Sequence, residues 1–455
     1  MTTTRRSFLK TSAAASAVFA APTIWTQSSN AQQAANDRIT IASIGVGGSR
    51  GRYNRGGQIA RSASKLGQTI AVCDVDDRHT AEFNKAFGGK LNMYRDYREL
   101  FEKEKPDVVT IGTPDHWHVP IATAALRAGC DVYCEKPLTL TIQEGIDINK
   151  VVKETGRVFQ VGTQQRSENG SRFLKAVAIA QSGRLGDNIS AHVAIGGAPS
   201  GGPFDSTDAP TDLDWNMWVG PAPTAAYCEQ RRKYFRWFFE YSGGKMTDWG
   251  AHHIDIAQWA MGQTNTGPVK VSSQGKFPGI IPDNFNWDAF LEGEGALPNG
   301  YNTATAFHID LGFSNGSTLS VNHHYKRESD GIDFGNGILL EGDKGRIFVN
   351  RGKLQGAAVD QLTDADNREL DELVVKLYKG QQPGNHMKNF FECVESRDQP
   401  ISDVATHHRT MTSCHLCNIS LMLGRELNWD PTNESFVSDE QANALKSRKN
   451  RQGFV

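Results

Sequence analysis

The chain has 455 residues, a formal net charge of −2 and a sequence pI near 6.7. A chain of this length predicts two or three folded units, at roughly 100 to 200 residues each. The balanced charge supplies no excess of cations to hold a phosphate backbone, so nucleic acid is excluded as an expected partner. The 45 glycines form no collagen-like or low-complexity repeat, which is typical of a loop-rich globular protein.

The first thirty residues differ from the rest of the chain. The run Thr4-Arg5-Arg6-Ser7-Phe8-Leu9-Lys10 precedes an apolar, alanine-rich stretch from Ala13 to Trp25, which indicates a twin-arginine export signal. That stretch is shorter than the roughly 20 residues that span a bilayer and contains Pro22, so a retained anchor is the weaker interpretation. We expect residues 1–31 to be a signal peptide that meets the membrane only during export, and the protein to be periplasmic or in the cell envelope.

A buried strand and a glycine turn open the next segment. Residues 38–44 alternate too little for a half-exposed strand and run into Gly45-Val46-Gly47-Gly48. Glycines at such a turn let backbone N–H groups approach a pyrophosphate at the following helix N-terminus. The match to G-x-G-x-x-G is imperfect, because Arg50 takes the last glycine position and Gly51 follows it. Gly45, Gly47 and Gly48 are nevertheless predicted to bind a dinucleotide.

A second buried strand, Gln68–Cys73, ends in Asp74. A carboxylate at this place meets the ribose hydroxyls of the adenosine half of a dinucleotide. It would repel a 2′-phosphate, so the sequence favours NAD. NADP stays possible, because Arg50, Arg52 and Arg78 are close enough in sequence to accommodate that phosphate.

Helices and short apolar strands then alternate along the chain. The predicted helices are Tyr94–Glu104 and Ile121–Ala128, and the predicted strands are Asp107–Gly112 and Asp131–Cys134. This order predicts an α/β domain with a parallel sheet, a Rossmann domain over residues 38–164. Ligands of such sheets bind at the carboxyl ends of the strands, where the loops Thr113-Pro114-Asp115-His116-Trp117-His118 and Glu135-Lys136-Pro137 lie.

Four motifs together resemble the signature set of the Gfo/Idh/MocA oxidoreductases. They are the glycine turn at 45–48, Thr113-Pro114 with His118, Glu135-Lys136-Pro137, and Asp248-Trp249-Gly250-Ala251-His252-His253-Ile254-Asp255. The resemblance covers essentially everything after the signal. It implies that Thr113, Pro114, His118, Glu135, Lys136 and Gln164 border the cofactor. It also implies that Lys136, Asp248 and His252 contact the substrate, with Asp255 in support.

The chemistry of these motifs gives two candidates for the acid-base group. Oxidising a secondary alcohol requires a group that takes the hydroxyl proton. Lys136 is one candidate, because a nearby nicotinamide and partial burial could depress its pKa. His252 is the other. In a single helix Asp248 and His252 stand four residues apart and His252 and Asp255 three apart, so Asp248 could orient His252, whereas His253 lies about 100 degrees round and packs or faces solvent.

Three further residues are predicted to bind the substrate: Arg166, Trp237 and Asp255. Arg166 follows the strand Val158–Gly162 at a domain junction, where simple packing is an equal alternative. Trp237 belongs to a run of charged and aromatic residues, 231–239, just before the catalytic motif. That position favours the wall of a sugar pocket over a nucleic-acid or membrane surface, because aromatic faces stack on sugar rings.

From residue 165 onward the pattern changes to one helix followed by a run of strands. The predicted strands are Ile189–Ile195, Val269–Gln274, Asn302–Phe313, Ser317–His324, Gly337–Glu341 and Gly345–Asn350. They predict an α+β domain over 165–430 with a large, mostly antiparallel sheet, followed by a C-terminal tail, 431–455. A sheet with helices on one face leaves the other to a second copy, so we expect a dimer or tetramer. The segments 201–214 and 278–300 are expected to be long surface loops.

The cysteines and histidine pairs favour neither disulfides nor metal. Cys414-His415-Leu416-Cys417 matches C-x-x-C, yet it lies in a helical segment, 407–427, without a second Cys or His pair at metal spacing. Burial in a helix interface is therefore preferred. The adjacent pairs His323-His324 and His407-His408 lack the acid spacing that completes a metal site.

The leading hypothesis is hydride transfer between NAD(P) and a secondary alcohol or ketone of a sugar, sugar acid or polyol. Free nicotinamide cofactor is not expected outside the cytoplasm, so a tightly held cofactor recycled by a second substrate is expected. The alternative is a glycoside hydrolase or lyase that uses bound NAD for transient oxidation and elimination. A sugar-binding protein with a vestigial cofactor fold is a third possibility, against which the intact set Lys136, Asp248 and His252 argues.

Overall fold

The computed structural model describes residues 38–48 and 54–454. The signal peptide predicted for residues 1–31 lies outside this range, as does Gly51. Within it, no helix is both long enough and apolar enough to cross a membrane.

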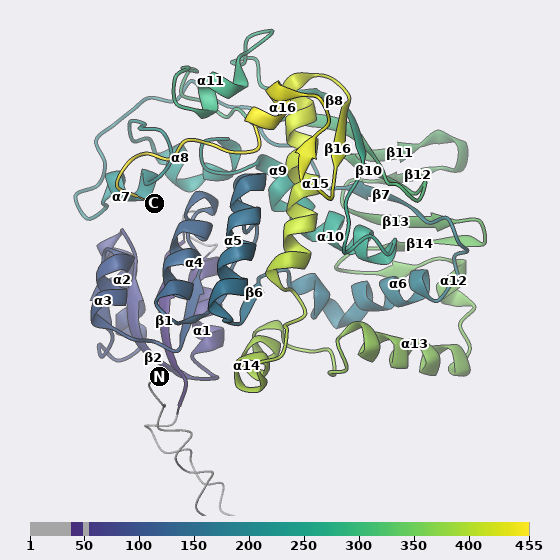
Figure 1. Ribbon diagram of the computed structural model, residues 1–455, viewed down its shortest axis with the longest axis horizontal. Helices are drawn as coiled ribbons and strands as arrows, with labels where there is room; N and C mark the ends of the chain where they lie inside the picture. Colours follow the sequence, from purple (N-terminus) through teal and green to yellow (C-terminus); the bar gives the residue numbers. More distant parts are fainter. Residues whose placement is uncertain (1–37, 49–53, 455) are drawn as a thin grey trace, which may run out of the picture. The chain divides into compact units, whose positions relative to one another are not determined.

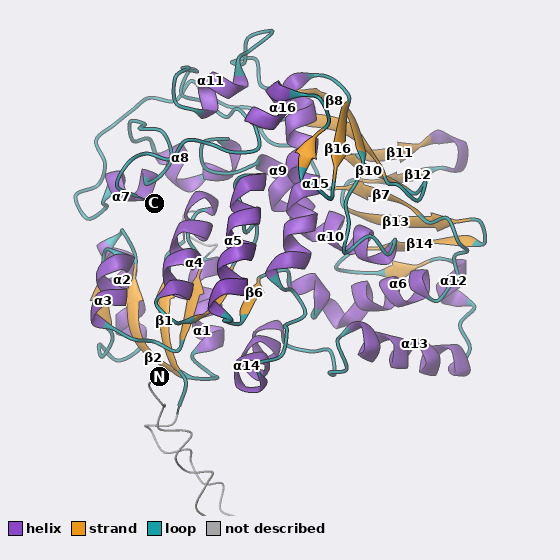
Figure 2. Ribbon diagram, viewed as in Figure 1, coloured by secondary structure: helices purple, strands orange, loops and turns teal. Residues whose placement is uncertain are grey.

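A six-stranded parallel sheet forms the first domain, with the strand order β3-β2-β1-β4-β5-β6 (Figures 1 and 2). Its strands are β1 (Thr40–Ile44), β2 (Gln68–Cys73), β3 (Asn92–Tyr94), β4 (Val108–Ile111), β5 (Asp131–Cys134) and β6 (Phe159–Val161). Its helices are α1 (Arg55–Ala63), α2 (Asp77–Ala86), α3 (Tyr97–Lys103), α4 (His118–Arg127) and α5 (Ile142–Thr155). Every residue of β4 and β5 is buried, which fits the mostly apolar sequences of the two strands. The predicted Rossmann sheet is confirmed.

One predicted helix starts later than its pattern suggested. The helix expected from Tyr94 begins at Tyr97, because the Asp96 side chain accepts from the backbone N–H of Arg98 and caps it. Tyr94 instead ends the short strand β3, which was not predicted.

The second domain is built on a nine-stranded sheet in the order β15-β14-β13-β7-β10-β9-β8-β16-β17. Its strands are β7 (Ser190–Ala194), β8 (Lys270–Lys276), β9 (Ala306–Gly312), β10 (Thr318–Asn322), β13 (Gly337–Gly342), β14 (Gly345–Val349), β15 (Leu354–Gln355), β16 (Leu427–Asp430) and β17 (Ser435–Phe436). A hairpin of β11 (Tyr325–Arg327) and β12 (Ile332–Phe334) stands apart. All neighbouring strands are antiparallel except β7 and β10, so the expected mostly antiparallel sheet is confirmed.

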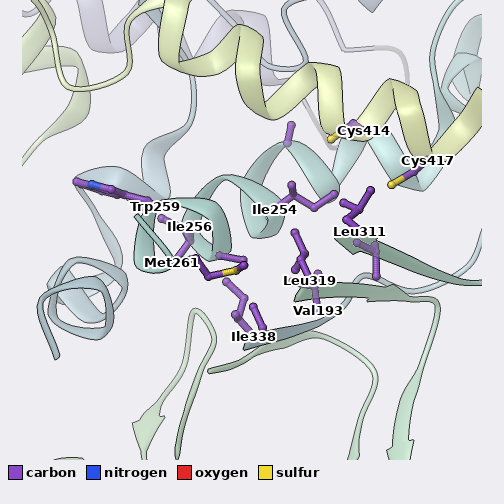
Figure 3. Packing of buried hydrophobic residues seen from close by; sticks show 14 of the residues in the cluster. Val193, Ile254, Ile256, Trp259, Met261, Leu311, Leu319, Ile338, Cys414 and Cys417 are labelled. Carbon is purple, nitrogen blue, oxygen red and sulfur yellow. The ribbon is translucent and has the colours of Figure 1, made fainter. Parts of the chain in front are cut away.

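Three helices, α6 (Arg172–Gln181), α10 (Gly250–Ala260) and α15 (Val404–Leu423), share one apolar core with this sheet. Figure 3 shows Ile254 of α10 among residues of that core, including Leu319 of β10. Cys414 and Cys417 project from α15 into the same cluster. Both are buried free thiols, and burial raises the pKa of each. The C-x-x-C match is therefore part of the helix packing, as expected.

The remaining helices lie on connections and edges. They are α7 (Trp215–Val219), α8 (Glu229–Lys233), α9 (Gly244–Asp248), α11 (Trp287–Leu291), α12 (Ala357–Asp360), α13 (Asp364–Leu377), α14 (His386–Ser396) and α16 (Glu440–Ala444). Although it comes late in the sequence, α14 packs on the Rossmann domain, where Phe390 joins Ile41 of β1 and Val108 of β4 in one apolar cluster.

Two predicted segments hold more structure than expected. The loop predicted at 278–300 contains α11, whose Trp287 and Phe290 belong to the main core. The packed structure continues past residue 430, where a tail was predicted, because β17 extends the sheet and Leu445 is buried in the same core. Both segments are ordered because their apolar side chains are buried in the main core, which their composition did not predict.

Candidate active site

A cavity of about 1090 Å³ runs along the carboxyl ends of β1, β2, β4 and β5. Most of the predicted cofactor residues line it: Gly45, Gly47, Gly48, Asp74, Thr113, Pro114, His118, Glu135 and Lys136. Gln164 lines a neighbouring cavity together with Glu135 and Lys136. The structure thus brings together residues that are spread over 120 positions of sequence, at the edge where parallel sheets bind ligands.

The glycine turn is a tight cradle at the start of α1. Gly45 has φ +75°, and a Cβ there would lie 2.7 Å from the Thr113 nitrogen. A Cβ on Gly56 would lie 1.7 Å from the Gly45 oxygen, so Gly56 lets α1 approach the turn. In the G-x-G-x-x-G motif the last glycine allows this close packing of helix against turn, and here Gly56 takes that role. The Thr113 hydroxyl is buried and, within the described residues, has no hydrogen-bond partner. This cradle, open along the strand ends, fits a dinucleotide.

Asp74 is fixed by the glycine turn itself. Its Oδ2 accepts from the backbone N–H groups of Val46 and Gly47 at 3.0 and 3.1 Å, and His79 Nδ1 lies 3.3 Å from its Oδ1. The arginines that line or border this end of the cavity are paired with carboxylates: Arg78 with Asp76 and Asp212, Arg95 with Asp77, and Arg232 with Asp76. Because these cations are already paired, the site suits the free ribose of NAD better than a 2′-phosphate. Arg50 and Arg52 lie outside the described residues.

His118 ties two loops together. Its Nδ1 lies 2.6 Å from the Pro137 oxygen and its Nε2 lies 2.9 Å from the Thr113 oxygen. The side chain is buried, and both ring nitrogens face main-chain carbonyls. His118 therefore lines this cavity and holds the Thr113 and Lys136-Pro137 loops in place.

Lys136 and Asp248 meet across the two domains. Lys136 Nζ donates to Asp248 Oδ1 at 2.6 Å and to the Asp248 backbone oxygen at 3.0 Å. Arg236 Nε also donates to Asp248 Oδ1, at 3.2 Å. Although burial opposes ionisation, Lys136 and Arg236 hold the pKa of Asp248 well below its usual value. The carboxylate is thus a fixed anion that positions the lysine ammonium.

The expected single helix through the catalytic motif is interrupted. α9 ends at Asp248 and α10 begins at Gly250, with Trp249 between them. The Asp248 carboxylate turns to Lys136 and Arg236, so the orientation of His252 by Asp248, expected from the spacing, is not observed. His252 Nδ1 is buried and has no hydrogen-bond partner in the described part of the chain.

His252 opens onto a second cavity, of about 620 Å³, which Lys136 and Glu135 share with the first. This second cavity is lined by Arg55, Glu135, Lys136, Gln164, Glu168, Asn169, Trp249, His252 and Arg351. Burial lowers the pKa of His252 well below its usual value, and the charges of Lys136 and Arg351 lower it further. The imidazole is therefore neutral near pH 7 and able to accept a proton.

His253, the residue after His252, packs in the protein interior. His253 is fully buried, and its Nε2 lies 3.1 Å from Asn336 Oδ1. Of the two histidines, His252 lines the cavity with Lys136 and His253 does not.

The predicted substrate residues Arg166 and Asp255 bind each other instead. Two hydrogen bonds of 2.7 Å join the guanidinium to the carboxylate, and the two side chains are 4% and 1% exposed. Arg166 lies over the ring of Trp259 and borders a different cavity, with Lys379. The spacing placed Asp255 on the face of His252, but it missed this partner, which comes from the segment after β6.

Trp237, the third predicted substrate residue, is buried in an aromatic cluster. Its neighbours in the sequence, Phe235 and Arg236, line the cofactor cavity in its place. Two arginines of the site were not predicted: Arg55, which pairs with Glu135 at 2.8 Å, and Arg351, whose guanidinium lies 4.6 Å from the centre of the Trp249 ring. Neither arginine belongs to a sequence motif. Arg55 begins α1, 80 positions before Glu135, and Arg351 lies in the loop after β14.

Within residues 38–48 and 54–454, no group of three or more His, Cys, Asp or Glu side chains is arranged to hold a metal ion. The histidine pairs have separate partners: His324 contacts Asp333 and His408 contacts Glu434, while His407 accepts from the backbone N–H of Leu138.

Two family models match the chain. One, described as an oxidoreductase family with an NAD-binding Rossmann fold, matches residues 39–163. The other, described as the C-terminal alpha/beta domain of the oxidoreductase family, matches residues 202–277 and 323–455. Fold, site and matches define a two-domain oxidoreductase of the NAD-binding Rossmann class. The two matches together cover well over half of the chain, which belongs to the Gfo/Idh/MocA family.

Individual relatives are similar over part of their length. Inositol 2-dehydrogenase of Azotobacter vinelandii is 30% identical over 175 residues, which are 38% of this chain and 50% of that protein. D-glucoside 3-dehydrogenase of Escherichia coli is 27% identical over 138 residues, 29% of this chain and 38% of that protein. The chain thus spans half or less of the length of these curated relatives.

Among solved structures, the WlbA dehydrogenase of Chromobacterium violaceum in complex with NADH and UDP-GlcNAcA superposes with a TM-score of 0.59. The identity is 15%, and the match covers 86% of this chain and 96% of that one. This likeness confirms the fold.

Proposed function

We propose that the protein is an NAD-dependent oxidoreductase that transfers hydride to or from a secondary alcohol or ketone of a sugar, sugar acid or polyol. The observation that carries the proposal is the junction of the two cavities at Lys136, where a dinucleotide cradle adjoins a polar cavity with a neutral His252. The names of the relatives, an inositol and a glucoside dehydrogenase, support a polyhydroxylated substrate.

Lys136 and His252 have separate roles in the proposed reaction. NAD, when bound, accepts or returns the hydride. Two N–H groups of the Lys136 ammonium are used by Asp248, which leaves the third to donate to the oxygen of the reacting carbon. Because His252 Nδ1 is buried, Nε2 is the nitrogen that can take the hydroxyl proton of a substrate in the cavity. In the reverse direction the same nitrogen returns the proton to the ketone oxygen.

The cofactor assignment is tested on purified protein that has folded in the cytoplasm. After denaturation, we expect the supernatant to contain NAD(H) close to one molecule per chain, measured by absorbance and mass. The variant Asp74→Ala, which removes the carboxylate at the ribose end, is expected to carry much less. Wild type that neither carries NAD(H) nor takes it up when it is supplied would contradict the proposal.

The glycoside hydrolase or lyase alternative uses the same residues. The two functions are distinguished by whether the reaction leaves NAD reduced. Net formation of reduced nicotinamide from a free sugar or polyol supports the dehydrogenase. Cleavage of an aryl glycoside without net reduction of NAD would replace it with the alternative.

We also propose export by the twin-arginine route, which moves folded proteins and so allows the cofactor to be loaded in the cytoplasm. The support is the run Arg5-Arg6 before the apolar stretch. Replacing both with lysine is expected to shift the protein from the periplasmic to the cytoplasmic fraction on immunoblots. An unchanged distribution would argue against this route.

The proposed homo-oligomer uses the face of the nine-stranded sheet opposite α6 and α10. That face carries the polar, exposed side chains His308 and Asp310 of β9. Light scattering on the purified protein tests it: the mass of a dimer or tetramer is expected, and the mass of one chain would exclude it.

A further inference from the structure

Residues 212–236, here called the strap, belong to the second domain and border the cofactor cavity. In the view of Figure 1 their helices lie above α2 and α4 of the Rossmann domain. The strap contains α7 and α8 and lines the cavity with Leu213, Met217, Trp218, Arg232, Phe235 and Arg236. These residues face the Rossmann side of the cavity, where Asp74, Thr113 and Trp117 lie. A dinucleotide in the cradle would therefore lie between the Rossmann domain and the strap.

The first part of the strap is joined to the Rossmann domain by backbone pairing. Leu213 stands opposite Asp76 in an isolated antiparallel bridge. The Asp77 N–H donates to the Asp212 oxygen at 3.0 Å, and the Asp214 N–H donates to the Val75 oxygen at 2.9 Å. This pairing begins directly after Asp74, at the ribose end of the cavity.

Ion pairs reinforce this backbone pairing between the strap and the Rossmann domain. Asp76 is 1% exposed and pairs with Arg232 of the strap and with Arg78 of α2. Arg78 Nε in turn lies 2.7 Å from Asp212 Oδ2 of the strap. Burial raises the cost of ionising Asp76, yet the hydrogen bond from Arg78 and the nearby cations lower the pKa of its carboxyl. Charged side chains of the strap and of the Rossmann domain thus form one network of ion pairs beside the cavity.

The middle of the strap is held from two sides. Trp117 Nε1 donates to the backbone oxygens of Met217 and Trp218 at 3.0 and 3.1 Å. From the chain's C-terminal part, Arg451 donates to the backbone oxygens of Gly220 and Asn216 at 2.8 and 2.7 Å. The ring of Phe454 packs edge-on against Trp117. The residues predicted as a peripheral tail therefore fasten the strap.

We propose that the strap completes the dinucleotide site and keeps NAD bound from one turnover to the next. The inference rests on the proposed function. Release of the cofactor past the strap requires the Asp76–Leu213 pairing and the Arg232 ion pair to open together, which slows dissociation. A second substrate of opposite redox state then restores the cofactor in place, one carbonyl being reduced for each alcohol oxidised.

The test measures the rate at which NAD leaves the loaded holoenzyme, captured by an external NAD-consuming enzyme added in excess. Two changes loosen the strap independently: Arg232→Ala, which removes the ion pair to Asp76, and truncation after Asn450, which removes the bonds of Arg451 and the Phe454 contact. We expect each to release NAD roughly 10- to 100-fold faster than wild type, the loss expected when charge-assisted hydrogen bonds are removed.

The matched control is Arg184→Ala, which breaks a comparable ion pair to Asp366 and Glu369 of α13, away from the cavity. It is expected to release NAD at the wild-type rate, and thermal melts confirm that each variant is folded. If wild type and both loosened variants release NAD equally fast, the strap does not retain the cofactor, while NAD binding stands. If wild type binds no NAD, the proposed function fails and the strap proposal with it.

Discussion

Replacing His252 by alanine is expected to lower the rate of alcohol oxidation roughly 10²- to 10⁴-fold, the range for one acid-base group, while NAD remains bound. The expectation follows from the position of His252 in the cavity beside Lys136 and from a pKa that burial lowers. A neutral imidazole at pH 7 is already in the form that accepts a proton. Turnover is measured as formation of reduced nicotinamide under saturating substrate.

The matched control is His253→Gln, one position further along α10. His253 is equally buried, but its Nε2 faces Asn336 instead of the cavity with Lys136. We expect this variant to keep its turnover within roughly tenfold of wild type, below the range for an acid-base group. Unchanged turnover in His252→Ala, or an equal loss in both variants, would remove His252 from its proposed role.

The second large effect is a steep loss of stability in mild acid. Burial lowers the pKa of His116, His407 and His415 to about 3, and that of His253 and His386 to about 4. In the unfolded chain each histidine titrates near pH 6.5, at about its ordinary value. Between the two values the unfolded chain binds more protons than the folded one, so stability is complete above about pH 6.5 and is lost as the pH falls below it.

The expected size follows from the same linkage. Each such histidine removes about 1.4 kcal/mol per pH unit once the unfolded form is protonated, and typical domains have only about 5 to 15 kcal/mol of stability. Urea unfolding from about pH 7.5 down to about pH 5 is expected to show a midpoint that falls steeply below about pH 6.5. A midpoint independent of pH over this range would show that these histidines are not buried neutral in solution.

The parallel sheet and much of the cofactor cavity could be predicted from the sequence. Strands of a parallel sheet are short and mostly apolar, and β2 and β5 were predicted with the bounds that the structure has. Their ends meet at one edge, so Asp74 and Lys136 were predicted to line one site without any knowledge of contacts.

Partners that come from distant segments could not be predicted in the same way. Asp255 has the right helical spacing to face the substrate, yet a buried arginine 89 positions earlier in the chain neutralises it. Asp248 was expected to orient His252, but the helix breaks at Trp249 and the carboxylate turns to Lys136. Arg232 reaches Asp76 over 156 positions, and periodicity, which describes one element at a time, contains no information on such pairs.

Hydride transfer is tested most directly by mixing NAD-loaded protein with single sugars, sugar acids and polyols and following the near-ultraviolet absorbance of the nicotinamide in one turnover. Hydride transfer at this site predicts that at least one of these alcohols produces reduced nicotinamide on the protein, that a ketone of the same class removes it, and that His252→Ala does neither at a comparable rate. Saturable sugar binding without any change in the nicotinamide would contradict it and leave a binding protein with a Rossmann fold.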